Sequence, residues 1–210
     1  TVSSMLFASE PVPLAEGLNT ITITAQDNYG YTVEKSVSIE RDSLAPELTV
    51  QEPAEDTFLR EREVLVSGSL SDTNAGYVTV NGQAAVMFRQ YFTRTLTLPD
   101  ADGSYELVIE AFDTAGNSTV ETRSVVLDRE APAYFHVIPE PFGWTNDTQP
   151  VISFGTTDSL AGIDYYELSI NGGAPFTVTS PYTPAVLADG EHLFTVTAYD
   201  RAGNFTSSAG

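Results

Sequence analysis

One short phrase occurs three times in the chain at a nearly constant interval, and this repeat limits the folds available. The phrase begins with alanine, has an aspartate two residues later and then a glycine, at residues 25–30, 111–117 and 198–204. Its aspartates, Asp27, Asp113 and Asp200, are 86 and 87 residues apart. A period of this length is typical of one domain type arranged in tandem. The sequence therefore predicts a string of similar domains.

Each copy of the phrase is preceded by a strand-like pattern. Apolar residues occupy every second position, as at Ile21, Ile23 and Ala25, with threonines between them. A period of two is that of a half-buried strand. A second run of the same kind follows the turn, at 33–39 and at 119–127. We therefore expect each phrase to be the turn of a β-hairpin.

The middle of the chain contains further strand and turn signals. Asn81-Gly82 and Asn171-Gly172 favour tight hairpin turns because both central residues of such turns need positive φ. No amphipathic helix pattern is present. The other strands expected in this region span 63–70, 77–80, 84–88 and 92–98. Many short strands with frequent turns predict an all-β fold of antiparallel β-sandwich domains.

The linkers between repeats are also repeated, and they set the predicted domain boundaries. Asp42-Ser-Leu-Ala-Pro46 matches Asp128-Arg-Glu-Ala-Pro132, and proline ends a strand and stiffens a joint. The predicted domains are 44–130, a complete sandwich, and 131–210, a sandwich without its final strand.

Residues 1–43 match only the C-terminal part of a repeat, and residues 7–14 correspond to the strand expected at 92–98. Because a piece of about 40 residues seldom folds alone, we expect a longer parent chain whose neighbouring domains are partners of this segment. The alternative is that a neighbouring subunit supplies the missing strands by strand addition.

The charge balance restricts the class of partner. The chain has 29 Asp and Glu against 9 Lys and Arg. Such a surface repels nucleic acid and anionic membranes and suits cations, although acidity also keeps an extended secreted protein soluble. Cysteine is absent, and no apolar run approaches the roughly 20 residues that span a bilayer. We expect neither nucleic-acid binding nor membrane insertion of this segment.

The middle repeat resembles a known group of domains. The matching residues are Pro46–Pro53, Val64–Asp72, Val78–Gly82 and the phrase at 111–117. They are similar to bacterial immunoglobulin-like (Big-type, cadherin-like) domains, found in surface adhesins and as accessory modules of secreted polysaccharide-degrading enzymes. The resemblance implies tandem Ig-like antiparallel β-sandwich domains in an extracellular setting. It does not by itself specify an activity, since such sandwiches have many roles.

The repeated aspartates have two interpretations. An aspartate that opens a turn accepts hydrogen bonds from amides further on, and glycine supplies positive φ, so turn chemistry alone explains the pattern. The second interpretation is Ca²⁺, which needs several carboxylate and carbonyl oxygens, and the resemblance implies that some relatives are stiffened by it. The candidate ligands are Asp27, Asp42, Asp113, Asp128 and Asp200. Further oxygen donors are Asp72, Glu130, Asp158 and Asp164. No EF-hand loop is present.

The aromatic residues of the last repeat also have two interpretations. Trp144, Tyr165 and Tyr182 could form a surface on which sugar rings stack. The alternative, which sandwich folds favour, is that they fill the core with their polar tips at the rim.

Catalytic signals are weak. The two histidines, His136 and His192, and the absence of cysteine argue against a zinc or transition-metal site, and no nucleophile elbow is evident. The sequence thus predicts a non-catalytic extracellular stalk, spacer or surface-filament segment that contacts a surface protein or glycan. The alternative function is that of carbohydrate-binding accessory domains of a secreted enzyme.

Overall fold

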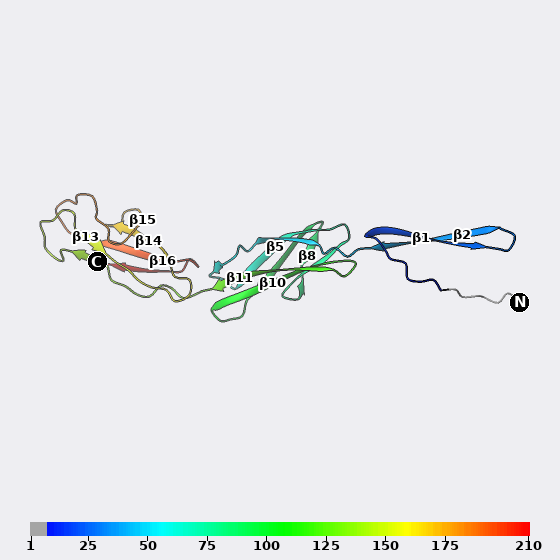
Figure 1. The fold of residues 1–210 in the computed structure, drawn as a ribbon. Coiled ribbons are helices and arrows are strands. Elements are labelled where there is room, and N and C mark those ends of the chain that lie inside the picture. The colour runs from blue at the N-terminus through cyan, green and yellow to red at the C-terminus, as the bar shows by residue number, and fades with distance from the viewer. Residues whose placement is uncertain (1–7) are drawn as a thin grey trace.

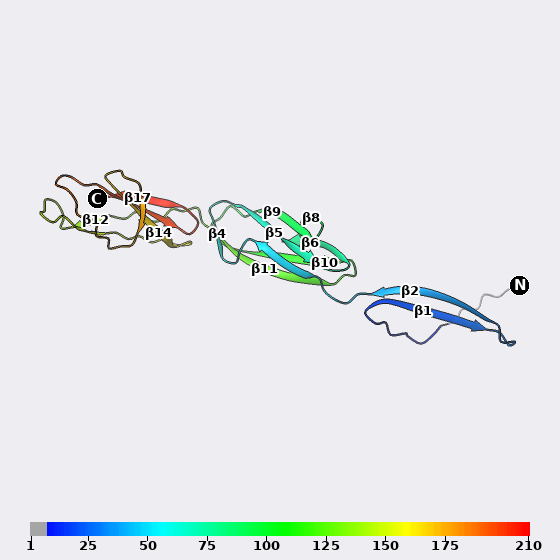
Figure 2. The ribbon, with the colours of Figure 1, turned by 90° about the horizontal axis from the view of Figure 1, so that it is seen from above.

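The computed structural model describes residues 8–210, and these residues are built from strands without any helix. None of them, accordingly, forms a helical span of a bilayer. Figures 1 and 2 show three parts that follow one another in a row. We call them the hairpin unit (17–41), the middle unit (46–128) and the last unit (132–210). The predicted all-β fold with antiparallel sheets is confirmed.

The hairpin unit consists of β1 (Gly17–Gln26) and β2 (Thr32–Arg41), paired antiparallel with Ile21 opposite Val37. These are the two strands that the alternating pattern predicts around the first turn. Residues 8–14, which the sequence matches to 92–98, form no strand, and residue 7 lies outside the described residues. The prediction at 8–14 is wrong because its counterpart in the middle unit pairs with a neighbouring strand that the hairpin unit does not have.

The middle unit is a sandwich of two sheets. The first sheet has the order β3 (Glu47–Glu52), β5 (Glu63–Ser71), β9 (Tyr91–Thr97), β8 (Val86–Phe88). The second has the order β4 (Thr57–Leu59), β11 (Ser118–Leu127), β10 (Gly103–Asp113), β6 (Ala75–Val80), β7 (Gln83–Ala84). The alternation of each strand directs Val66, Leu107, Ile109 and Val125 inward, where all four are fully buried.

One predicted strand of the middle unit is divided between the two sheets. Residues 84–88 are a single strand in the sequence pattern, but Ala84 pairs with Thr79 in the second sheet, whereas Val86 pairs with Thr93 in the first. Ala85 lies between them and donates its N–H to the carbonyl of Val78. The chain thus crosses from one sheet to the other within two residues. The alternation of apolar and polar residues does not predict this crossing.

The last unit has its own core. Its main sheet has the order β15 (Phe176–Val178), β14 (Ile163–Ile170), β16 (Phe194–Asp200), β17 (Phe205–Ala209), and β12 (Ile138–Glu140) pairs with β13 (Val151–Ser153). Ile152, Leu168 and Val196 are fully buried between these layers. The core residues of the middle and last units form two separate clusters.

The prediction that the chain stops before a final strand needs correction. After the third turn, Phe205–Ala209 already form β17, which pairs antiparallel with β16. Five residues suffice because the edge of β16 offers them a complete set of backbone partners. The matching strand of the middle unit, β11, is ten residues long.

Candidate functional site

Each repeated phrase of the two sandwiches folds around its aspartate. One oxygen of the Asp113 carboxylate accepts the N–H groups of Gly116 (2.6 Å) and Asn117 (2.8 Å), and the other accepts the side-chain amide of Asn117 (2.6 Å). Gly116 has a φ of 100°, a conformation that favours glycine. Asp200 accepts the same two kinds of bond from Asn204, at 2.8 and 2.9 Å. The turn interpretation of the phrase therefore fits its geometry.

The asparagine of each phrase also attaches the unit to the linker before it. The side-chain amide of Asn117 donates to the carbonyl of Asp42 (3.3 Å), and that of Asn204 donates to the carbonyl of Asp128 (2.9 Å). Two residues further on, a threonine hydroxyl of each unit donates to the carbonyl of the linker proline, Pro46 in one case and Pro132 in the other. The two linkers are thus docked by the same set of hydrogen bonds.

The docking brings three carboxylates together at each linker. Asp42, Asp72 and Asp113 each place one oxygen within 4.8 Å of the others, and we call this cluster joint 1. Asp128, Asp158 and Asp200 do the same, and we call this cluster joint 2. In each joint one aspartate comes from the linker, one from the loop that follows or precedes a sheet strand, and one from the phrase.

The hydrogen bonds around the carboxylates differ between the joints. In joint 1 the side-chain amide of Asn74 donates to Asp42 (3.1 Å), and the backbone N–H of Asn74 donates to Asp72 (2.6 Å). In joint 2 the backbone N–H of Ala161 donates to Asp128 (2.8 Å), while Asp158 accepts two backbone N–H groups of its own loop. Joint 2 is the more enclosed of the two, because Asp128 and Asp200 are 0% and 2% exposed.

The electrostatics of the joints reflect this enclosure. Burial raises the pKa of Asp128, and the nearby carboxylates of Asp158 and Asp200 raise it further, against the lowering effect of its backbone hydrogen bonds. Burial also acts to raise the pKa of Asp113, but the hydrogen bonds from Asn117 and the neighbouring turn amides outweigh it and hold the pKa below its usual value. Within residues 8–210, no arginine or lysine forms an ion pair with a joint carboxylate. The negative charge of each joint is therefore not neutralised by a basic side chain.

Four of the five predicted metal ligands lie in these clusters. Asp42 and Asp113 belong to joint 1, and Asp128 and Asp200 belong to joint 2. Asp27 is placed apart, at the tip of the hairpin unit, where its carboxylate accepts the N–H groups of Tyr29 and Tyr31 at 2.8 and 3.0 Å. In the part of the chain that the structure describes, it has no carboxylate cluster around it.

The third carboxylate of each joint is among the further oxygen donors that the sequence predicts. Asp72 and Asp158 complete the clusters, whereas Glu130 and Asp164 lie outside them. The 86-residue spacing of Asp72 and Asp158 is the signal that distinguishes them, since it equals the spacing of the linker aspartates.

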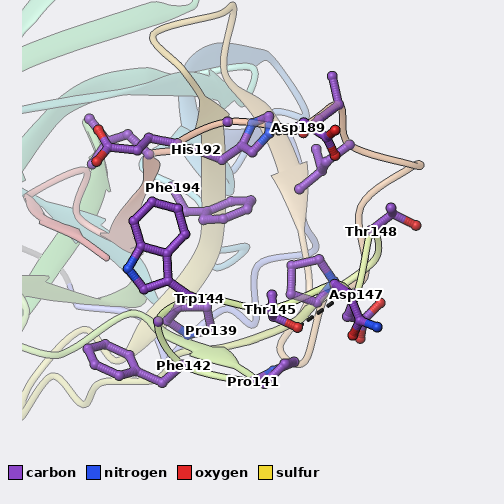
Figure 3. A pocket seen from close by; sticks show the side chains of 18 of the residues that line it. Pro139, Pro141, Phe142, Trp144, Thr145, Asp147, Thr148, Asp189, His192 and Phe194 are labelled. Atoms are coloured by element: carbon purple, nitrogen blue, oxygen red, sulfur yellow. Dashed lines mark hydrogen bonds between the residues drawn. The ribbon is translucent and has the colours of Figure 1, made fainter.

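The predicted aromatic residues do not share one surface. Trp144 is 99% exposed, so the expectation that it packs in the core is wrong. It lines a cavity of about 880 Å³ in the last unit, together with Phe142 and His192 (Figure 3). Tyr165 stacks on Tyr199 with ring centroids 4.7 Å apart, and Tyr182 packs against the core, so neither lines this cavity.

Comparison with known proteins places the fold. Residues 46–129 match the family "Glucodextranase, domain B". The chain is 29% identical over 174 residues to Bacillopeptidase F of Bacillus subtilis, and it spans 11% of the length of that protein. The fibronectin(III)-like modules of Clostridium thermocellum CbhA align with a TM-score of 0.50 at 14% identity, over 78% of this chain and 92% of theirs. The middle and last units thus have the β-sandwich fold of the Ig-like and fibronectin(III)-like kind.

Proposed function

We propose that the chain is a non-catalytic segment of an extracellular array of Ig-like domains, and that it acts as a stalk, spacer or surface-filament segment. One observation carries this proposal: both linkers are docked by the same asparagine and threonine hydrogen bonds to linker carbonyls. A contact that recurs at each linker gives every unit the same attachment to the one before it. Units attached in this way form an extended body, as Figures 1 and 2 illustrate.

The proposed partners of such a segment are neighbouring domains of its own chain and a surface protein or glycan at the end of the array. The acidic composition, with 29 acidic against 9 basic residues, supports an exposed, strongly hydrated role. The resemblance of the middle unit to an accessory domain of an enzyme supports the absence of catalysis from these residues.

Joints 1 and 2 are the proposed Ca²⁺ sites of this array. Ca²⁺ takes six to eight oxygen ligands in flexible geometry, and each joint offers three carboxylates within 4.8 Å of one another. A bound cation would neutralise carboxylates that have no basic partner, and it would connect the linker aspartate to the two aspartates of the following unit. Its role is therefore mechanical, because it restricts bending between units.

Calcium binding is tested by unfolding the full chain in Ca²⁺ and in chelator. The NMR signals of the buried Ile152 and Leu168 follow the last unit and hence joint 2. A ligand at a hundredfold excess over its Kd stabilises the folded state by about 2.7 kcal/mol, so we expect a higher Tm in Ca²⁺. Asp158→Asn should abolish the increase, because it removes one charge while keeping an oxygen acceptor for the loop amides.

The matched control is Asp164→Asn, which removes an exposed acidic residue near the start of β14 that lies outside the cluster. Coinciding melts in Ca²⁺ and chelator would contradict a structural cation. The spacer role is tested separately by small-angle X-ray scattering: a compact particle, with a maximum dimension far below that of the row in Figure 1, would rule it out.

A second candidate function is carbohydrate binding by the last unit. The observation that favours it is the exposure of Trp144 (99%) and Phe142 (86%) beside a cavity that also carries acidic side chains. Aromatic faces with polar groups at their edges are suited to sugar rings. Glycan-array binding that is lost in a folded Trp144→Ala variant would support this function, and equal binding by both proteins would exclude it at this cavity.

A further inference from the structure

One contact joins the middle and last units directly rather than through the linker between them. The guanidinium carbon of Arg201 lies 5.5 Å from the centre of the Phe58 ring. A guanidinium within about 6 Å of the face of an aromatic ring forms a cation–π contact. Phe58 belongs to β4 of the middle unit, and Arg201 belongs to the repeated phrase of the last unit. The contact therefore connects the bodies of two neighbouring units.

Phe58 is held at the end of the middle unit from which the linker leaves. It pairs with Val126 of β11, and the next residue, Leu59, packs against the buried core. Because successive side chains of a strand point to opposite faces, the Phe58 ring is directed away from that core. The carbonyl of Leu59 accepts the backbone N–H of Asp128, the first linker residue (2.8 Å). β4 therefore brings the ring beside the linker, at the end of the middle unit next to the last unit (Figure 2).

Arg201 is positioned by the turn to which it belongs. Its backbone N–H donates to the carbonyl of Gly162 (3.2 Å), and the preceding Asp200 accepts two hydrogen bonds from Asn204. Of the ion pairs among residues 8–210, none involves Arg201, although a joint 2 carboxylate belongs to the adjacent residue. The guanidinium is thus directed at the Phe58 ring rather than at joint 2.

The phrase of the middle unit carries a different side chain at this position. Thr114 is the counterpart of Arg201, since each directly follows the aspartate of its phrase. The backbone N–H of Thr114 donates to the carbonyl of Asn74 (2.9 Å), so its turn is attached to a neighbouring loop as in the last unit. Its side chain, however, is short and uncharged, and it offers no cation to a ring. The two joints therefore share their linker hydrogen bonds, but the cation–π contact belongs to joint 2.

We propose that Arg201 and Phe58 form a latch that holds the last unit at a fixed angle on the middle unit without a bound cation. This inference rests on the proposed array of units and deepens it, because it makes the joints of the array unequal. With the latch, joint 2 keeps its angle when Ca²⁺ is removed. Joint 1, which has Thr114 at the same position, lacks this restraint. The stiffness of each joint is thus set by the residue that follows the aspartate of the phrase.

The test measures the spread of distances across joint 2 in the full chain. The chain has no cysteine, so Thr95→Cys and Thr177→Cys, at exposed positions of the middle and last units, accept two spin labels without a competing thiol. Pulsed electron paramagnetic resonance in chelator gives the distribution of distances between the labels. In Arg201→Thr, which gives joint 2 the residue of joint 1, the population outside the main distance should rise about two- to fivefold, the factor that an exposed cation–π contact supports.

A partner substitution and a control show whether the ring contact is the cause. Phe58→Leu should broaden the distribution by the same factor as Arg201→Thr. The two substitutions together should have no greater effect than either alone, because both remove one and the same contact. The matched control is Arg60→Thr, which removes an equal charge from an exposed position two residues from Phe58 and should leave the distribution unchanged.

Three results would overturn the latch. The first is a distance distribution that Arg201→Thr and Phe58→Leu leave unchanged. The second is equal broadening by Arg60→Thr, because net charge rather than the ring contact would then be responsible. The third is a distribution in the unsubstituted chain that is already as broad in chelator as that of Arg201→Thr. Small-angle X-ray scattering tests the array separately, since a chain can remain extended without the latch and can be compact with it.

Discussion

The hairpin unit and the hairpin of the middle unit have the same pattern but different surroundings. β1 and β2 correspond to β10 and β11 at a spacing of 86 residues, and both pairs have the same antiparallel register around the turn. Ile109 is fully buried, whereas its counterpart Ile23 is 42% exposed. The difference lies in the first sheet, β3-β5-β9-β8, which packs over β10 and β11 and has no equivalent against β1 and β2 within residues 8–210. Local sequence thus specifies the hairpin, and a separate sheet specifies its burial.

The largest change in stability is expected from a substitution at Ile109, the buried member of this pair. Ile109→Ala should destabilise the middle unit by about 2–5 kcal/mol, because it leaves a cavity among residues that cannot collapse fully. Ile23→Ala should change the stability by less than about 0.5 kcal/mol, since its side chain already contacts water. Guanidinium unfolding followed by NMR signals of each unit measures both. Equal losses at the two positions would mean that the hairpin unit is covered in solution.

The turns provide a second, smaller contrast. Asn204 is 7% exposed and bonds both Asp200 and the carbonyl of Asp128, whereas the corresponding residue of the hairpin unit, Tyr31, is 77% exposed. Asn204→Ala should cost about 2–4 kcal/mol, because one of the two lost bonds is to a charged group and both acceptors are buried. Tyr31→Ala should be nearly neutral. NMR signals of the buried core of the last unit, followed in guanidinium, measure the first change, and a loss of stability below about 0.5 kcal/mol would show that Asn204 does not hold the linker.

The sequence predicted the parts of the molecule that depend on local chemistry. The period of two located both strands of each hairpin, and the Asp and Gly of the phrase indicated turns that form around Asp113 and Asp200. It located four of the six joint carboxylates, because the linkers repeat with the same period as the phrases.

What the sequence did not specify depends on contacts between distant segments. The division of 84–88 between two sheets requires both sheets to be present, and no local pattern encodes it. Asp72 and Asp158 enter the joints because the chain brings them to the phrase across the sandwich. Trp144 lies outside the core, at the cavity of the last unit, although its residue type alone favours burial.

The smallest contrast concerns the acidic residue at the start of each hairpin. Glu16 and Asp102 correspond at the same 86-residue spacing, and each accepts hydrogen bonds from a residue just after its second strand. A bond from the Ser43 hydroxyl, followed by one from the Ser43 backbone, lowers the pKa of Glu16. A bond from the Arg129 side chain lowers the pKa of Asp102 in the same way. We call each acidic residue with its donor a corner: the corner of the hairpin unit is Glu16 with Ser43, and that of the middle unit is Asp102 with Arg129. The two units therefore use different donors at the same position.

Both carboxyl groups have a lower pKa in the folded protein than in the unfolded chain. Each therefore contributes to the free energy of unfolding at a pH above its unfolded-state pKa, and this contribution is lost as the pH falls through its folded-state pKa. The usual values are 4.5 for Glu16 and 3.8 for Asp102, so each loss begins below these values. NMR titration of the side-chain carboxyl groups should show Ser43→Ala returning the pKa of Glu16 toward 4.5, and Arg129→Ala returning that of Asp102 toward 3.8. Salt distinguishes the two corners further: it should weaken the effect of the charged Arg129 donor on Asp102 and leave the effect of the neutral Ser43 donor on Glu16 largely unchanged. An equal response of both corners to salt would mean that the Arg41 guanidinium, 2.9 Å from Glu16, rather than Ser43, controls the first corner.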